Sequence, residues 1–222
     1  MLTMTQTARK TQEQSRIRTN PLPVVASDER KWRTLGECAH RFSVTEYALL
    51  AEAGILHEDD RIELIEGRIE DMAPIGSSHA SSVKRLLKTF VTRFQSQATV
   101  GVQDPVQLNA FSEPQPDVML LQPRDDFYAE RHPAPEDVLL LIEVADSSVE
   151  YDQQVKIPLY AKSGIQEVWL FNLRDQCVEV YRSPVGESYE TILILRGQQE
   201  VTPLAFPEVS LTIADLLGRT TK

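Results

Sequence analysis

Two apolar runs of strand length each contain a single carboxylate, and this pattern constrains the fold more than any other. Residues 116–121 contain Asp117, and residues 139–145 contain Glu143. Apolar runs bounded by turn-forming segments are typical of strands that are buried on both faces. A carboxylate held against such a strand loses hydration, and two nearby carboxylates repel each other. Because Mg²⁺ prefers oxygen ligands, the pattern predicts a metal site where two strands end.

The periodicity of the rest of the chain predicts an α/β fold, with a mixed sheet flanked by helices. Ser43 and Glu46 form a capping-box pattern at the start of an N-terminal helix. Glu66-Gly67 lies between two apolar segments, as in the turn of a hairpin. Helices are expected over residues 77–98, 150–162 and 213–217, and Pro158 predicts a bend or broken turn in the second of them. Strands are expected over residues 100–108, with an interruption at residues 103–105, and over residues 117–121, 139–145, 165–173, 177–181 and 188–195.

The composition indicates one globular domain preceded by a flexible arm. Residues 1–33 are polar and aperiodic, so we expect an arm there and a folded domain over residues 34–222. No apolar run approaches the length of a membrane span, and the N-terminus lacks the apolar centre of a secretion signal. Cys38 and Cys177 show no metal-type spacing. We therefore expect a cytoplasmic protein with no membrane partner. The net charge of −10 argues against tight sequence-independent binding of nucleic acid.

The residues around the two acids suggest phosphodiester hydrolysis. Asp117 and Glu143 would hold the metal ion, and the backbone carbonyl of Val144 would add a third ligand at the strand end. Lys156 would orient or help to deprotonate the attacking water, or stabilise the pentavalent phosphorus. Glu63 would bridge to a second ion or to water at the first ion.

An alternative interpretation explains these residues without a metal or catalytic site. Asp152, Lys156 and Tyr160 are spaced four residues apart on one predicted helix, so they share a face. Asp152 and Lys156 would then form a surface ion pair worth about 0.3–0.5 kcal/mol. Asp117 would mark the turn that follows Pro116. A glutamate inside a leucine-rich run is harder to explain in this way, because a buried carboxylate is costly unless it has a partner.

Several segments match one family pattern. They are Pro-Asp-Val-Met-Leu-Leu at residues 116–121, Leu-Ile-Glu-Val-Ala-Asp-Ser-Ser at residues 141–148, and Gly-Ile-Gln-Glu-Val-Trp at residues 164–169. Together they resemble the Uma-type restriction endonuclease family, which is common in cyanobacteria and belongs to the PD-(D/E)XK nuclease superfamily. The resemblance runs from Phe42 to Leu217. It implies a restriction endonuclease-like core with an N-terminal helix and hairpin.

The resemblance assigns Asp117 as the motif aspartate and Glu143 as the motif acid. The superfamily's usual lysine stands two residues after that acid, where this chain has Ala145. Related families move the lysine to the following helix, which is the position of Lys156. The residues that would join the same pocket in supporting roles are Glu63, His79, Gln103, Asp152 and Tyr160.

By this resemblance the chain would be a Mg²⁺-dependent endonuclease that acts on DNA, with Mn²⁺ as a substitute metal. Duplex cleavage by such folds often employs two subunits, so a homodimer is among the expectations, although the sequence marks no interface. Two alternatives stay open. Ala145 and the acidic charge favour a nuclease-fold module that binds nucleic acid or protein without catalysis. A small-molecule phosphoesterase would use the same metal.

Overall fold

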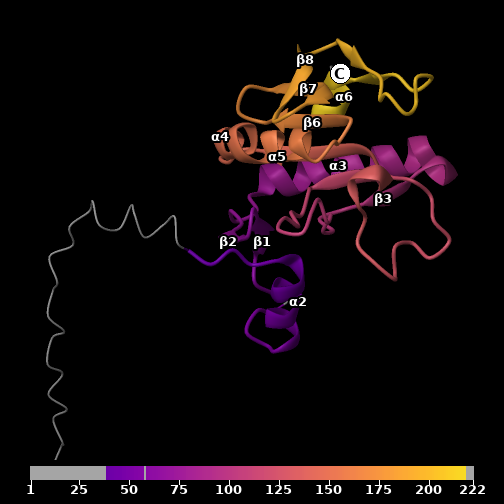
Figure 1. Ribbon diagram of the computed structural model, residues 1–222. Coiled ribbons are helices and arrows are strands. Elements are labelled where there is room, and N and C mark those ends of the chain that lie inside the picture. The colour runs from indigo at the N-terminus through magenta and orange to yellow at the C-terminus, as the bar shows by residue number, and fades with distance from the viewer. Residues whose placement is uncertain (1–38, 58, 219–222) are drawn as a thin grey trace, which may run out of the picture. The chain divides into compact units, whose positions relative to one another are not determined.

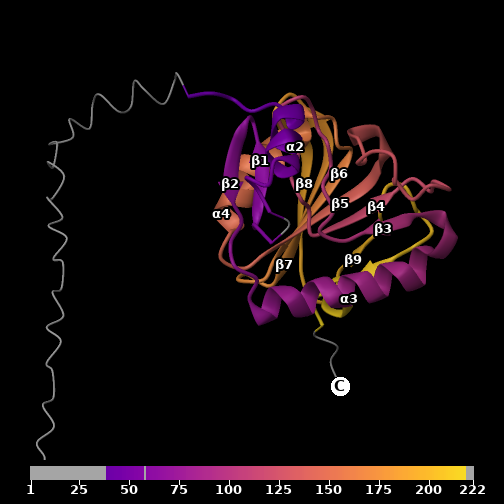
Figure 2. The same ribbon diagram turned by 90° about the horizontal axis from the view of Figure 1, so that it is seen from below.

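Six strands form one mixed sheet in the computed structural model of the chain, which describes residues 39–57 and 59–218 (Figure 1). The strand order is β3-β4-β5-β6-β7-β8, and helices lie on both faces of the sheet (Figure 2). The predicted mixed α/β fold is therefore confirmed. No described helix is both long enough and apolar enough to cross a membrane. The arm predicted over residues 1–33 lies outside the described residues.

Neighbouring strands of this sheet are antiparallel except for the central pair. The strands are β3 (Thr99–Gly101), β4 (Val118–Leu121), β5 (Val138–Ala145), β6 (Glu167–Asn172), β7 (Cys177–Val185) and β8 (Ser188–Leu195). β5 and β6 run parallel, with Glu143 paired to Leu170. Parallel neighbours require a crossover, so the segment that joins these two strands must pass over one face of the sheet.

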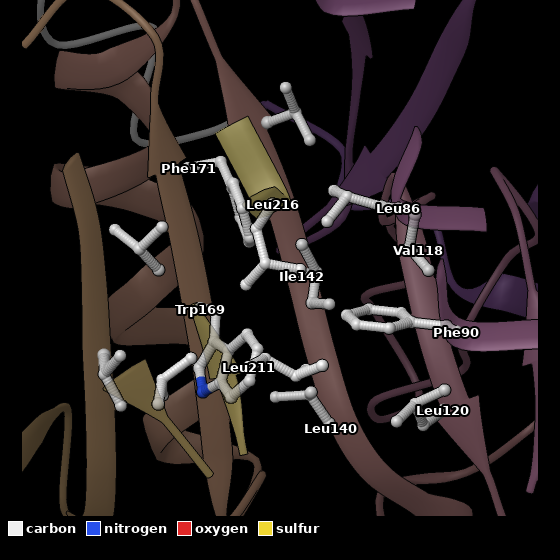
Figure 3. Close-up of a cluster of buried hydrophobic side chains, with 14 of the residues drawn as sticks. Leu86, Phe90, Val118, Leu120, Leu140, Ile142, Trp169, Phe171, Leu211 and Leu216 are labelled. Atoms are coloured by element: carbon white, nitrogen blue, oxygen red, sulfur yellow. The ribbon is translucent and has the colours of Figure 1, made fainter. Parts of the chain in front are cut away.

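One face of the sheet packs against α3 (Ser77–Phe94) and the short helix α6 (Ile213–Leu217). Leu86 and Phe90 of α3 lie against alternate side chains of the central strands, such as Ile142 and Trp169 (Figure 3). These four side chains are fully buried. Burial of an apolar side chain of this size contributes about 1.5–3 kcal/mol, so this apolar cluster is a main source of stability.

The opposite face is covered by a helical segment in three parts. These are α4 (Val149–Tyr151), the π-helical turn η4 (Asp152–Lys156) and α5 (Ile157–Lys162), where one helix over residues 150–162 was predicted. Pro158 lacks an N–H and its ring clashes with the carbonyl four residues before it, so the preceding turn widens. Both Asp152 and Lys156 are buried by this turn.

The N-terminal helix and hairpin form as predicted. They are α2 (Val44–Glu52), β1 (Ile62–Ile65) and β2 (Arg68–Asp71), and the Ser43–Glu46 capping box is present. Glu66 and Gly67 have φ values of 48° and 82°, as a type I′ turn requires. A Cβ on Gly67 would lie 2.7 Å from the Cβ of Arg41, so glycine is needed there.

Three predicted boundaries are wrong. α3 ends at Phe94 and continues as the 3₁₀ turn η2 (Gln95–Gln97), not as an α-helix to residue 98. β7 runs to Val185 and not only to residue 181. β3 stops at Gly101 and does not resume after the predicted interruption, where Gln103 has a positive φ of 56° and Pro105 has no N–H to donate. The sequence pattern also did not predict the short strand pair β9 (Glu200–Val201) and β10 (Leu211–Thr212), or the 3₁₀ turn η3 (Pro135–Asp137).

Candidate active site

The two strand-borne acids lie at neighbouring strand ends and line one cavity. β4 begins at Val118, which pairs with Ile142 of β5. Asp117 thereby lies beside Val144, whose N–H donates a 2.9 Å hydrogen bond to Asp117 Oδ2. The side chain of Glu143 lines the same cavity, which has a volume of about 510 Å³. Asp117 is 8% exposed and Glu143 is 3% exposed, so both carboxylates are largely removed from bulk water.

Asp117 Oδ1 has two further partners among the predicted supporting residues. His79, in the first turn of α3, approaches with Nε2 at 2.8 Å, and Gln103 donates from Nε2 at 3.2 Å. The hydrogen bond to Asp117 raises the pKa of His79 above its ordinary value, while burial acts against it. A hydrogen bond to the Val144 backbone raises this pKa further. His79 therefore favours its protonated form beside the Asp117 carboxylate.

Lys156 brings an ammonium group into the acid cluster. Its Nζ lies 3.1 Å from Glu63 Oε2 and 3.2 Å from Glu143 Oε1, and the residue is 6% exposed. Burial alone would lower the pKa of Lys156, but the carboxylates of Glu143, Glu63 and Asp152 raise it well above its ordinary range. The group therefore stays positively charged at neutral pH, and it stabilises negative charge rather than accepting a proton.

Two acids of the cluster hold their protons more tightly than usual. Burial raises the pKa of Glu143 to about 8 and that of Asp152 to about 6, although Lys156 acts in the opposite direction on both. Tyr160 donates its O–H to Glu143 Oε1 at 2.5 Å, and Ser148 donates to Asp152 Oδ2 at 2.9 Å. Crowded, dehydrated carboxylates of this kind favour the arrival of a further cation.

The cavity also contains residues that the sequence did not single out. Glu70, Asp71 and Asp146 add acidic groups, and Arg61 adds a cation. The hydroxyl of Tyr151 is buried without a hydrogen-bond partner among the described residues, and burial raises its pKa to about 12. Arg61, Glu70 and Asp71 enter the cavity only because the hairpin packs beside the strand ends. Asp146 directly follows β5, and Tyr151 is the last residue of α4.

The donor set fits a cation that retains several water ligands. Asp117 and Glu143 offer carboxylate oxygens, and the Val144 carbonyl points to the same side of its strand as the N–H that reaches Asp117. Across residues 39–57 and 59–218, no three His, Cys, Asp or Glu side chains form a group that could hold a metal ion. Two carboxylates are the number through which Mg²⁺ commonly binds, whereas a structural zinc site uses four protein ligands.

Comparison with known proteins places the sequence in a family. Residues 44–214 match the Uma2 family, whose description is "Putative restriction endonuclease". The chain belongs to this family. The fold is also similar to a crystal structure described as "a putative nuclease belonging to DUF820" from Anabaena variabilis ATCC 29413. The TM-score is 0.62 at 19% sequence identity, over 80% of this chain and 98% of that one. No curated protein matches the sequence.

Membership in the Uma2 family confirms the predicted resemblance. Ala145, where that resemblance leads one to expect a lysine, is fully buried in β5. The ammonium of Lys156 instead enters from η4, on the next helical segment. The predicted site residues that line the cavity are Asp117, Glu143, Val144, Lys156, Glu63, His79 and Asp152. Gln103 and Tyr160 contact its acids without lining it. The catalytic and metal-binding roles of all nine residues stay predictions.

Proposed function

We propose that this Uma2-family chain is a metal-dependent endonuclease that hydrolyses phosphodiester bonds of DNA. The observation that carries the proposal is the contact of 3.2 Å between Lys156 Nζ and Glu143 Oε1 at the wall of a cavity that Asp117 also lines. Phosphodiester hydrolysis needs oxygen ligands for a cation and a positive group near the reacting phosphate. The description of the family supports the same reaction class.

Asp117 and Glu143 would hold Mg²⁺, or Mn²⁺ in its place, and the carbonyl of Val144 would add an oxygen ligand. When bound, the ion polarises a phosphoryl oxygen and makes the attacking water more nucleophilic. His79 and Gln103 fix the orientation of the Asp117 carboxylate through their contacts with Oδ1. The orientation of a ligand depends on such partners, so both residues act as positioning groups.

Lys156 stabilises the negative charge that increases on the phosphoryl oxygens during attack. The acids around it raise its pKa, so it remains an ammonium and is not the base that removes a proton from water. Glu63 holds this ammonium in place, and its Oε2 also accepts the backbone N–H of Gln115 at 3.2 Å. Loss of a positive group that stabilises transition-state charge lowers rates by about 10²–10³-fold in comparable cases.

Cleavage of supercoiled plasmid DNA in Mg²⁺ or Mn²⁺ tests the proposal. We expect nicked and linear products with wild type and none with Asp117→Ala. Asp126→Ala is the matched control, because Asp126 pairs with Arg124 away from the cavity, and this variant should cut as wild type does. Equal cleavage by wild type and Asp117→Ala would remove Asp117 from the mechanism.

A second candidate is a nuclease-fold module that binds a partner without catalysis. It is favoured by the lining of the cavity, where acids outnumber Arg61, His79 and Lys156 and would repel a phosphate in the absence of a cation. Calorimetric titration with Mn²⁺ separates the two candidates. Saturable binding that Asp117→Ala abolishes supports the endonuclease, and no binding by wild type supports the module.

A further inference from the structure

The strand at one end of the sheet, β8, exposes an apolar stretch. Ile192, Leu193 and Ile194 are consecutive, and they are 55%, 40% and 52% exposed. β8 pairs with β7 on one side and, within the described part of the chain, with no strand on the other (Figure 1). An apolar edge with unpaired backbone groups is a template for another strand. The strand at the opposite end, β3, has only three residues.

The pairing of β6, β7 and β8 determines which backbone groups of β8 point outward. Leu173 donates its backbone N–H to the carbonyl of Ala145 in β5, so the odd-numbered residues of β6 bond to β5 and its even-numbered residues bond to β7. The even-numbered residues of β7 are then left to bond to β8, as Val180 does to Leu193. The backbone N–H and C=O groups of Ile192 and Ile194 therefore point away from β7.

The charges at this edge are self-complementary. Glu190 and Arg196 are both exposed and lie symmetrically about Leu193 in the sequence. No described residue forms a salt bridge with either of them. If two copies pair antiparallel with Leu193 at the twofold axis, Glu190 of each copy lies opposite Arg196 of the other. In this register Ile192 lies opposite Ile194 of the second copy, on the same face of the sheet as the charged pairs.

We propose that two copies of this chain associate through β8, antiparallel and with Leu193 at the twofold axis, so that two sheets become one continuous sheet. The register aligns the outward backbone groups of Ile192 and Ile194 with those of the second copy and adds about four hydrogen bonds. It also packs Ile192 and Ile194 of each copy against the isoleucines of the other copy. The contact is isologous and occupies the β8 edge of each copy, so the assembly closes at two copies. This association does not depend on the proposed hydrolysis.

Sedimentation equilibrium of the full chain, from nanomolar to submillimolar concentration, tests the association. Wild type should dimerise reversibly, and Ile194→Lys should raise the dissociation constant at least about tenfold by placing a charge against an apolar neighbour. Val91→Lys is the matched control, because Val91 is 51% exposed on α3 and lies outside β8. A wild type that stays monomeric throughout, or equal constants for the two lysine variants, would overturn the proposal.

Charge reversal tests the register. Glu190→Arg alone and Arg196→Glu alone each place like charges opposite each other twice in the dimer, so each should weaken it about tenfold. The double variant Glu190→Arg/Arg196→Glu restores opposite charges and should recover the wild-type constant. A double variant that dimerises as poorly as the single variants contradicts the pairing about Leu193.

Amide hydrogen exchange identifies what covers the edge. The amides of Ile192 and Ile194 should exchange quickly in dilute monomer and slowly in concentrated dimer. Protection that persists in the monomer would mean that another segment of the same chain occupies β8. Rapid exchange at every concentration would mean that the dimer forms elsewhere. Either result rules out the proposed interface.

Discussion

Glu143 and Glu167 are both carboxylates buried in the central strands, but their surroundings differ. Glu167 is 1% exposed and accepts hydrogen bonds from Trp169 Nε1, from the Arg182 guanidinium and from the backbone N–H of Leu204. It does not line the cavity. Glu143 lines it among other acids, and burial raises its pKa. Burial of a single carboxylate therefore does not by itself indicate a functional site. Several buried acids crowded at an open cavity are the pattern that indicates a candidate site.

The largest expected effect is on stability, from removal of the cation that each acid contacts. Lys156→Met leaves Glu63 and Glu143 buried without their ammonium, so the free energy of unfolding at neutral pH should fall by about 3–5 kcal/mol. Added Mn²⁺ should restore part of the lost free energy of unfolding, because a metal ion at the carboxylates replaces the missing positive charge. Urea unfolding with and without Mn²⁺ measures both quantities.

Arg182→Met is the matched control for this comparison. It removes the cation beside Glu167, which does not line the cavity, so it should also destabilise the protein, but Mn²⁺ should restore nothing. Equal rescue of both variants by Mn²⁺ would show that the two acids do not differ in the way described.

The next effect concerns cleavage. Glu143→Gln keeps the shape of the side chain but weakens the oxygen ligand, and plasmid cleavage in Mg²⁺ should fall at least about 100-fold. Glu167→Gln should cleave as wild type does while losing about 1–3 kcal/mol of stability, because it weakens the charge-assisted bonds with Arg182. Cleavage assays beside urea unfolding separate the two outcomes, and the reverse pattern would refute the assignment of Glu143.

A smaller effect is expected on the pH dependence of metal binding. Burial raises the pKa of Glu143 to about 8 and that of Asp152 to about 6, so protons compete with the metal ion near neutral pH. Because the ion binds the deprotonated carboxylate, Mn²⁺ affinity should rise with pH, by up to about tenfold per pH unit for each proton displaced. Calorimetry over this range measures how steeply the Mn²⁺ affinity rises with pH. Glu143→Gln should make this dependence weaker above neutral pH. An affinity independent of pH in wild type would exclude Glu143 as a ligand.

The smallest effect comes from a hydroxyl behind the cavity. Tyr160→Phe removes the O–H that donates to Glu143, and Mn²⁺ affinity should fall about tenfold. Tyr181→Phe is the matched control, because its O–H donates to Glu179, a buried acid that does not line the cavity. Calorimetric titration of both variants checks the difference, and similar losses would point to general loosening of the structure.

Local features of this fold were predictable from the sequence. The Ser43–Glu46 capping box and the Glu66-Gly67 turn depend on residues within a few positions of one another, and both formed as predicted. The interruption near Gln103 and the disturbance at Pro158 were predicted, but their form was not. That β3 ends for good at Gly101 and that the turn before Pro158 is π-helical depend on how the chain packs on the sheet.

The candidate site was only partly predictable for a physical reason. Glu143 and Glu167 each lie in an apolar run, so the pattern predicts burial of both and cannot tell which one meets the cavity. That Asp117 lies beside Val144 depends on the pairing of β4 with β5, and the family resemblance supplied this relation before the structure did. No sequence pattern marked Arg61, which reaches the cavity through the packing of the hairpin, or Tyr151, which reaches it from α4.

The π-helical turn η4 makes the number of residues in this segment as important as their identity. Each residue of an α-helix turns the chain by about 100°, and the wide turn accommodates one additional residue while the helix continues in the same direction. Loss of a single residue between Asp152 and Lys156 would let α5 and the adjoining Lys156 remain on the sheet while Asp152 rotated by about 100° relative to them. Chains of this family that differ by one residue there would share an architecture and differ in which acids lie near the lysine.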